Sequence, residues 1–124
     1  MGKTILLVDD NVDTREMLHM YLTSNGYSVV MASTGGEGLY LAGSERPDLI
    51  LTDIGLGDID GTELIKSVKQ NPELEGVPVV ALTALADLRA EDIKDAGADR
   101  LIGKPMDPAQ LLSVIKDLLG EREE

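Results

Sequence analysis

Polar side chains follow four of the five short apolar segments in this chain, each at the point where the segment ends. Two carboxylates, Asp9 and Asp10, follow the first segment, and Asp53 ends the third. The fourth segment ends at Thr83 and the fifth at Lys104. Three carboxylates that converge repel one another unless a cation joins them. With no Cys in the chain and no His nearby, such oxygen ligands favour Mg²⁺ or Mn²⁺ over zinc.

The other two side chains suit a phosphate group held beside such a cation. Mg²⁺ usually keeps several waters and binds one or two carboxylates together with phosphate oxygens of a substrate. Lys104 would supply a point charge to the phosphate, and Thr83 a neutral hydrogen-bond donor. A carboxylate beside Mg²⁺ and Lys is suited to accept a phosphoryl group on its own oxygen. The set therefore indicates metal-assisted phosphoryl transfer to a carboxylate.

The elements that must position these residues are five buried strands and five helices in alternation. Apolar runs predict the strands at residues 5–8, 28–32, 49–53, 77–82 and 100–103. Helical spacing predicts one helix between Asn11 and Asn25, one that Asp87 caps and that ends near Ala96, and three at about residues 35–43, 61–70 and 108–119. Strands that are apolar on both sides and joined by helices predict an α/β fold with a parallel sheet between two helical layers.

In a parallel sheet, the polar strand ends lie on one edge of the sheet. Each of them also has an ordinary explanation, since an acidic pair after a strand often only caps the next helix. Their agreement on one edge is improbable by chance and favours the metal and phosphate site.

Two helices have distinctive patterns. The first should present one apolar face, formed by Met17, Leu18, Tyr21 and Leu22. The second contains Gly35, Gly36 and Gly38. Because each interior Gly costs roughly 1 kcal/mol relative to Ala, we expect the second helix to be the loosest.

The composition is that of one acidic domain with an aliphatic core. The chain has 124 residues, 43% of them hydrophobic, with no Phe or Trp. Its net charge of −12 repels nucleic acid and anionic lipid, so we expect it to bind neither. No apolar run approaches the roughly 20 residues needed to span a bilayer, and the start does not read as a signal peptide. We therefore expect a cytoplasmic protein.

Taken together, five motifs resemble the receiver domain of two-component response regulators, over essentially the whole chain. The motifs are Leu6-Leu7-Val8-Asp9-Asp10-Asn11, the loop from Asp53 to Gly61, Ala81-Leu82-Thr83-Ala84, Ala96-Gly97-Ala98-Asp99 and Gly103-Lys104-Pro105. The resemblance implies a flavodoxin-like (βα)5 fold, with a doubly wound five-stranded parallel sheet in the order 2-1-3-4-5. It also implies that residues 1–124 form a single receiver domain.

The resemblance assigns ligand roles to four residues. Asp53 would be the phosphoacceptor and would take a phosphoryl group from a histidine of a sensor kinase or phosphotransfer protein. Asp10 and Asp53 would bind Mg²⁺ directly, and Asp9 largely through a bound water. The backbone carbonyl of Gly55 would be a further ligand, and Mn²⁺ would be able to replace Mg²⁺.

The remaining motif residues would contact or report the phosphoryl group. Lys104 would contact its oxygens, and the peptide bond between Lys104 and Pro105 is expected to be cis. Thr83 would swing toward the phosphoryl group, and the small Ala84 would leave access to it. Such a protein is not a conventional enzyme, because it catalyses only its own phosphorylation and dephosphorylation. It would signal by altered binding to another protein, as a monomer or weak dimer.

The chain departs from the family pattern at three points. Leu101 stands where the family usually has a Tyr or Phe that turns inward as Thr83 moves, and Leu lacks the ring and the hydroxyl. Gly57 stands where Pro is common, which predicts a more mobile loop. No output domain follows the last helix, so the signal would be read by another protein on the surface of the fourth helix, fifth strand and fifth helix.

Two other hypotheses stay open at the level of the sequence. A Mg²⁺-dependent phosphohydrolase would also form an aspartyl-phosphate, but it typically needs a second acid at the position of Gly55 and a cap for which there is no spare sequence. An interaction module that keeps the fold without the chemistry usually lacks one of the acids or the Lys, and this chain has them all. A variant of this idea makes the chain the receiver of a hybrid kinase or larger regulator.

Overall fold

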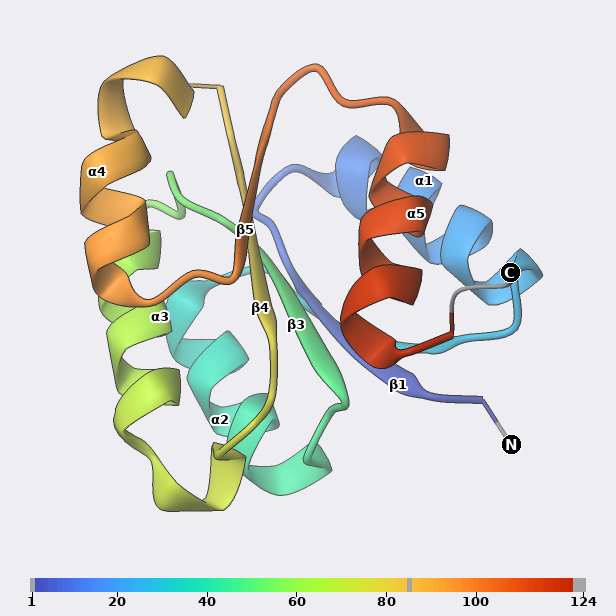
Figure 1. Ribbon diagram of the computed structural model, residues 1–124, viewed down its shortest axis with the longest axis horizontal. Helices are drawn as coiled ribbons and strands as arrows, with labels where there is room; N and C mark the ends of the chain where they lie inside the picture. Colours follow the sequence, from blue (N-terminus) through green and yellow to red (C-terminus); the bar gives the residue numbers. More distant parts are fainter. Residues whose placement is uncertain (1, 85, 122–124) are drawn as a thin grey trace.

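Aliphatic runs form the five strands of one parallel sheet in a computed structural model that describes residues 2–84 and 86–121 (Figure 1). The strands are β1 (Thr4–Val8), β2 (Ser28–Ala32), β3 (Leu49–Asp53), β4 (Val79–Thr83) and β5 (Arg100–Gly103). They pair in the order β2-β1-β3-β4-β5, which confirms the expected order and fold class.

Four helices connect the strands and a fifth follows β5, and together these helices cover both faces of the sheet (Figure 1). They are α1 (Val12–Ser24), α2 (Gly35–Glu45), α3 (Gly61–Gln70), α4 (Ala86–Ala96) and α5 (Pro108–Leu119). Helices α1 and α5 cover one face, and α2, α3 and α4 cover the other. A short 3-10 turn, η1 (Pro72–Leu74), follows α3. No helix in the described part of the chain is long and apolar enough to cross a membrane.

The core consists of two aliphatic layers, one on each face of the sheet. In β1, Leu6 and Val8 face α2 and α3, whereas Ile5 and Leu7 face α1 and α5, and all four side chains are fully buried. This alternation follows from the two-residue period of a strand. Because both faces are covered, the polar ends of the strands are the places where chemistry can meet solvent.

Both described ends of the chain lie at the edge of the sheet opposite these polar strand ends. β1 begins at Thr4, and α5 runs back along the sheet to the same edge (Figure 1). There the Tyr27 hydroxyl, just before β2, donates a hydrogen bond of 2.7 Å to Oε1 of Glu121. The last described residue is thereby tied to the start of β2.

The structure differs from the sequence-based expectation in two helices. Met17 was expected on the buried face of α1, but its side chain is 41% exposed, whereas Leu18 and Leu22 are fully buried. The sheet buries only a narrow stripe of α1, and Met17 lies one residue, about 100°, away from Leu18 around the helix axis. Asp87 was expected to cap α4, but α4 begins at Ala86, so Asp87 lies in the first turn. The side chains of Ala86 and Asp87, and residue Leu85, lie outside the described part of the structure.

The loop after β3 is closed by a tight contact at Gly61, the first residue of α3. The Gly61 N–H donates a hydrogen bond of 2.8 Å to the Ile54 carbonyl. A Cβ atom at Gly61 would lie 2.6 Å from both the Asp53 carbonyl oxygen and the Ile54 Cα. Only glycine allows the start of α3 to approach the end of β3 this closely.

We therefore expect Gly61→Ala to lower the free energy of unfolding by about 1–3 kcal/mol, as overpacking usually does. Gly43→Ala is the matched control, since it lies in the interior of α2 and its added Cβ would meet nothing within 4 Å. That variant should gain roughly 0.5–1 kcal/mol from the difference in helix propensity. Urea unfolding followed by circular dichroism measures both changes. Equal stabilities of the two variants would contradict the close contact at Gly61.

Candidate functional site

The acidic ends of β1 and β3 meet at one edge of the sheet, as the sequence predicts. Carboxylate oxygens of Asp9, Asp10 and Asp53 lie within 4.8 Å of one another. Asp9 is fully buried, the Asp53 side chain is only 13% exposed and Asp10 is exposed. Three carboxylates that face one another through oxygen atoms are the donor set that a hard divalent cation prefers. The residues present therefore fit Mg²⁺ or Mn²⁺.

Lys104, which follows β5, bridges two of these carboxylates. Its Nζ lies 3.0 Å from Oδ2 of Asp9 and 3.3 Å from Oδ2 of Asp53. A buried charge such as that of Asp9 is strongly destabilising unless it is paired. The peptide bond from Lys104 to Pro105 is cis, as the sequence resemblance implies.

Backbone groups hold the two buried carboxylates in place. The Asn11 N–H donates to Oδ1 of Asp9 at 2.9 Å, and the Ile54 N–H donates to Oδ1 of Asp53 at 2.8 Å. The Arg15 guanidinium reaches back from α1 and donates to the Asp9 carbonyl at 2.7 Å. The loops after β1 and β3 thus fix one oxygen of each carboxylate.

The electrostatics of the site follow from this geometry. Burial raises the pKa of Asp53 above its usual value and the charge of Asp9 adds to this effect, while Lys104 opposes it. For Lys104, burial alone would lower the pKa, but the contacts with Asp9 and Asp53 outweigh it and the pKa is raised. Lys104 therefore remains a cation, whereas the surroundings of Asp53 disfavour its ionised form.

A cavity of about 260 Å³ opens beside these groups. It is lined by Asp53, Ile54, Gly55, Thr83, Ala84, Arg89 and Lys104. Thr83, at the end of β4, is almost fully buried, whereas Ala84 is exposed at the mouth. Every residue that the sequence places at the phosphate site, apart from the two acids after β1, borders this space.

Arg89 is the one lining residue that sequence reasoning missed. It lies on α4, and its guanidinium forms two hydrogen bonds with Asp60, from Nη1 to Oδ1 at 3.2 Å and from Nη2 to Oδ2 at 2.9 Å. Its Nε also lies 3.5 Å from Oδ2 of Asp92, one helical turn along α4. Donation from Arg89 lowers the pKa of Asp60 to about 2. A single Arg within a helical pattern carries no sequence signal for such a position.

The loop between β3 and α3 is anchored on both sides of the site. Asp58 accepts hydrogen bonds of 2.9 Å from the backbone N–H groups of Gly35 and Gly36 at the start of α2. Asp60, two residues on, is held by Arg89 from α4. Between β3 and these anchors, Gly57 adopts a φ of 90°, which proline cannot adopt because its ring fixes φ near −65°. The expected mobility of this loop stays a prediction, and these anchors oppose it.

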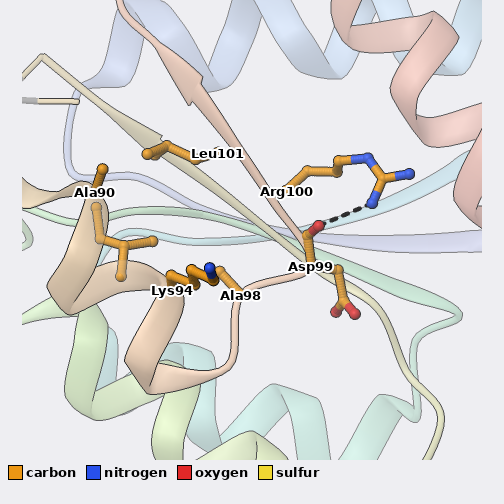
Figure 2. A pocket seen from close by; sticks show the side chains of 7 residues that line it. Ala90, Lys94, Ala98, Asp99, Arg100 and Leu101 are labelled. Carbon is orange, nitrogen blue, oxygen red and sulfur yellow. Dashed lines mark hydrogen bonds between the residues drawn. The ribbon is translucent and has the colours of Figure 1, made fainter. Parts of the chain in front are cut away.

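A second hollow lies on the surface between α4 and β5, and Ala90, the residue after Arg89, forms part of its lining. It has a volume of about 360 Å³, and Figure 2 shows Ala90 and Lys94 of α4 on one side of it and Leu101 of β5 on the other, with Ala98 beside Lys94. Leu101 is partly buried and packs against the core layer that contains Ile93. The Leu101 side chain thus forms an aliphatic part of the lining of this surface hollow.

Comparison with known proteins agrees with this geometry. The family model described as response regulator receiver domain matches residues 5–116. The polar-differentiation response regulator DivK of Brucella anthropi is 35% identical over 98% of this chain and 99% of its own. A response regulator structure from Chloroflexus aurantiacus is 36% identical, with a TM-score of 0.91 over 97% of this chain and 99% of that one.

One further solved structure bears on the metal. The receiver domain of a sensor histidine kinase from Pseudomonas aeruginosa is 30% identical, with a TM-score of 0.90 over 97% of this chain and 99% of that chain. That structure has a magnesium ion coordinated in its active site cleft. The resemblance seen in the sequence motifs is thereby confirmed at the level of both sequence and fold.

The raised pKa of Asp53 leads to a test of the site without any ligand. In buffer with EDTA near pH 7, Asp53→Asn should unfold at a higher temperature than the wild type, because ionised Asp53 opposes folding. As the pH falls through the raised pKa of folded Asp53, the wild type takes up a proton there and the difference should narrow. Thermal unfolding followed by circular dichroism measures the difference, with Glu91→Gln on the exposed side of α4 as the control. A less stable Asp53→Asn would show instead that the pair with Lys104 outweighs burial.

Proposed function

The chain belongs to the receiver-domain family of two-component response regulators, and we propose that it is a phosphorylation-dependent switch whose phosphoacceptor is Asp53. Receiver domains are signalling domains and not conventional enzymes. The observation that carries the proposal is Lys104, which holds Asp53 and the buried Asp9 together beside an open cavity. That arrangement combines a nucleophilic carboxylate with a cation that can neutralise an incoming phosphate.

The proposed reaction moves a phosphoryl group from a phosphohistidine of a sensor kinase or phosphotransfer protein. A carboxylate oxygen of Asp53 attacks the phosphorus atom, a P–O bond forms, the P–N bond breaks and its electron pair returns to the imidazole nitrogen. Oδ1 of Asp53 is held by the Ile54 N–H, so Oδ2, on the side of Lys104, is the proposed nucleophile. Lys104 then stays beside the transferred oxygens and offsets their charge.

Residues of this chain would also hold a divalent cation. Asp10 and Asp53 would bind Mg²⁺ directly, Asp9 largely through a water, and Gly55 through its backbone carbonyl. When bound, the cation supplies positive charge that neutralises the phosphoryl oxygens and the acids around them. Support comes from the carboxylate cluster in this chain and from the magnesium ion in the related Pseudomonas receiver. Mn²⁺, which prefers the same oxygen ligands, is proposed as a substitute.

The signal is proposed to leave through altered protein binding. Thr83 borders the cavity and would donate a hydrogen bond to the phosphoryl group, with Ala84 leaving room at the mouth. The surface formed by α4, β5 and α5, with Leu101 in its hollow, would then be read by a downstream protein. We further propose that residues 1–124 act as one receiver domain, monomeric or weakly dimeric, in the cytoplasm, and that the domain hydrolyses its own aspartyl-phosphate.

Intact-mass spectrometry tests this function directly. After incubation with Mg²⁺ and acetyl phosphate, the wild type should gain one phosphoryl group, and EDTA should prevent the gain. Asp53→Asn should gain none, because the attacking oxygen is gone. Thr83→Ala, in contrast, should still be phosphorylated, since Thr83 supplies neither the nucleophile nor a metal ligand. An adduct that persists in Asp53→Asn would mean that a different carboxylate is the acceptor.

A further inference from the structure

Arg89 lies between the phosphate cavity and the start of α3. It borders the same cavity as Asp53, Thr83 and Lys104. Asp60, at the end of the loop before α3, holds it there through two hydrogen bonds. Among the residues that line this cavity, only Arg89 and Lys104 carry positive charge. The Lys104 ammonium group already contacts Asp9 and Asp53, whereas the Arg89 guanidinium contacts Asp60.

Asp60 is a partner that is able to release the guanidinium. It caps α3, accepting a hydrogen bond of 3.1 Å from the Thr62 N–H and a further one from the Thr62 hydroxyl. Its side chain is 39% exposed, so water can replace Arg89 at its oxygens. Losing Arg89 therefore leaves Asp60 hydrogen-bonded and hydrated, and the cap of α3 intact.

We propose that Arg89 leaves Asp60 when Asp53 carries a phosphoryl group and binds the phosphoryl oxygens instead. This inference rests on the proposed function and adds a second cationic ligand to its site. A phosphoryl group carries nearly two negative charges and three acceptor oxygens, whereas Asp60 offers one charge that is already shared with Thr62. The planar fork of Arg, which binds Asp60 through two nitrogens, is equally suited to two phosphoryl oxygens.

The exchange gives α4 a direct link to the reaction. Ala90 and Lys94, on the same helix as Arg89, form one wall of the hollow between α4 and β5 (Figure 2). When Arg89 changes partner from Asp60 to the phosphoryl group, α4 loses its contact with the loop before α3 and is drawn toward the cavity. The surface of α4 thus responds to phosphorylation without an aromatic side chain at position 101, where this chain has Leu101.

The test measures the affinity of the full chain for beryllofluoride, an inorganic mimic of the phosphoryl group, by ¹⁹F NMR in Mg²⁺ buffer. Arg89→Gln should weaken the affinity by about tenfold, the effect of losing a charge-assisted hydrogen-bond donor. Asp60→Asn should strengthen it a few-fold, because the guanidinium no longer has to leave a carboxylate. Asn is also a good N-cap, so α3 keeps its start in this variant. In the double variant, the gain from Asp60→Asn should vanish.

The opposite signs together with the double variant distinguish a switch from a structural clamp, because the effects of two independent charges on an anion would simply add, whereas the gain from Asp60→Asn should need Arg89. If Arg89 only holds α4 against the loop, both single variants loosen the same contact, and their effects on beryllofluoride affinity will share one sign or be absent. Either result overturns the inference. Arg89→Lys, which keeps the charge but loses the fork, should lie between wild type and Arg89→Gln, and it covers the case in which Arg89→Gln does not fold. A wild type that binds no beryllofluoride would contradict the proposed function. Equal affinities in the wild type and in all variants would contradict only the inference about Arg89.

Discussion

One ammonium group pairs with two of the three carboxylates of the site. Lys104 contacts a fully buried carboxylate and a largely buried one, at the edge where the parallel strands of the sheet end. Without it, Asp9 would be a buried carboxylate that has lost its cationic partner, which is strongly destabilising. The two core layers, the lengths of the strands and the loop after β5 all have to bring this one nitrogen atom to within about 3 Å of both carboxylates. The chemistry and the stability of the fold therefore share the same contact.

The loop between β3 and α3 is where the fold adjusts to that site. Gly61 brings the start of α3 against the end of β3, and this contact fixes the loop at its far end. Between Asp53 and Gly61, the two acids of the loop reach in different directions, Asp58 to α2 and Asp60 to α4. The segment that carries the reacting carboxylate is thus connected to two neighbouring helices through hydrogen bonds that a change at Asp53 can redistribute.

Much of this arrangement could be predicted from the sequence, and the parts that could not have physical reasons. The strands, their parallel pairing and the meeting of Asp9, Asp53 and Lys104 follow from apolar runs and from what comes after each of them. Met17 was misplaced because helical spacing marks a candidate face without showing how narrow a stripe the sheet buries. Arg89 and its pairing with Asp60 were missed because Arg89 is an ordinary residue in its own segment, and only the tertiary fold brings the two together. Residue roles at the site are still predictions, since proximity alone does not establish them.

The separation between the reactive edge and the chain ends has a practical consequence. The hydrogen bond from Tyr27 to Glu121 secures the last described residue at the edge of the sheet farthest from Lys104. A fluorophore or affinity handle attached to the side chain of a residue at either described end would lie on that far side. The acidic edge and the α4–β5 hollow would then both face the solution, so that immobilised protein can be supplied with phosphodonor and partner together. The same geometry makes this fold a convenient input module for an engineered sensor.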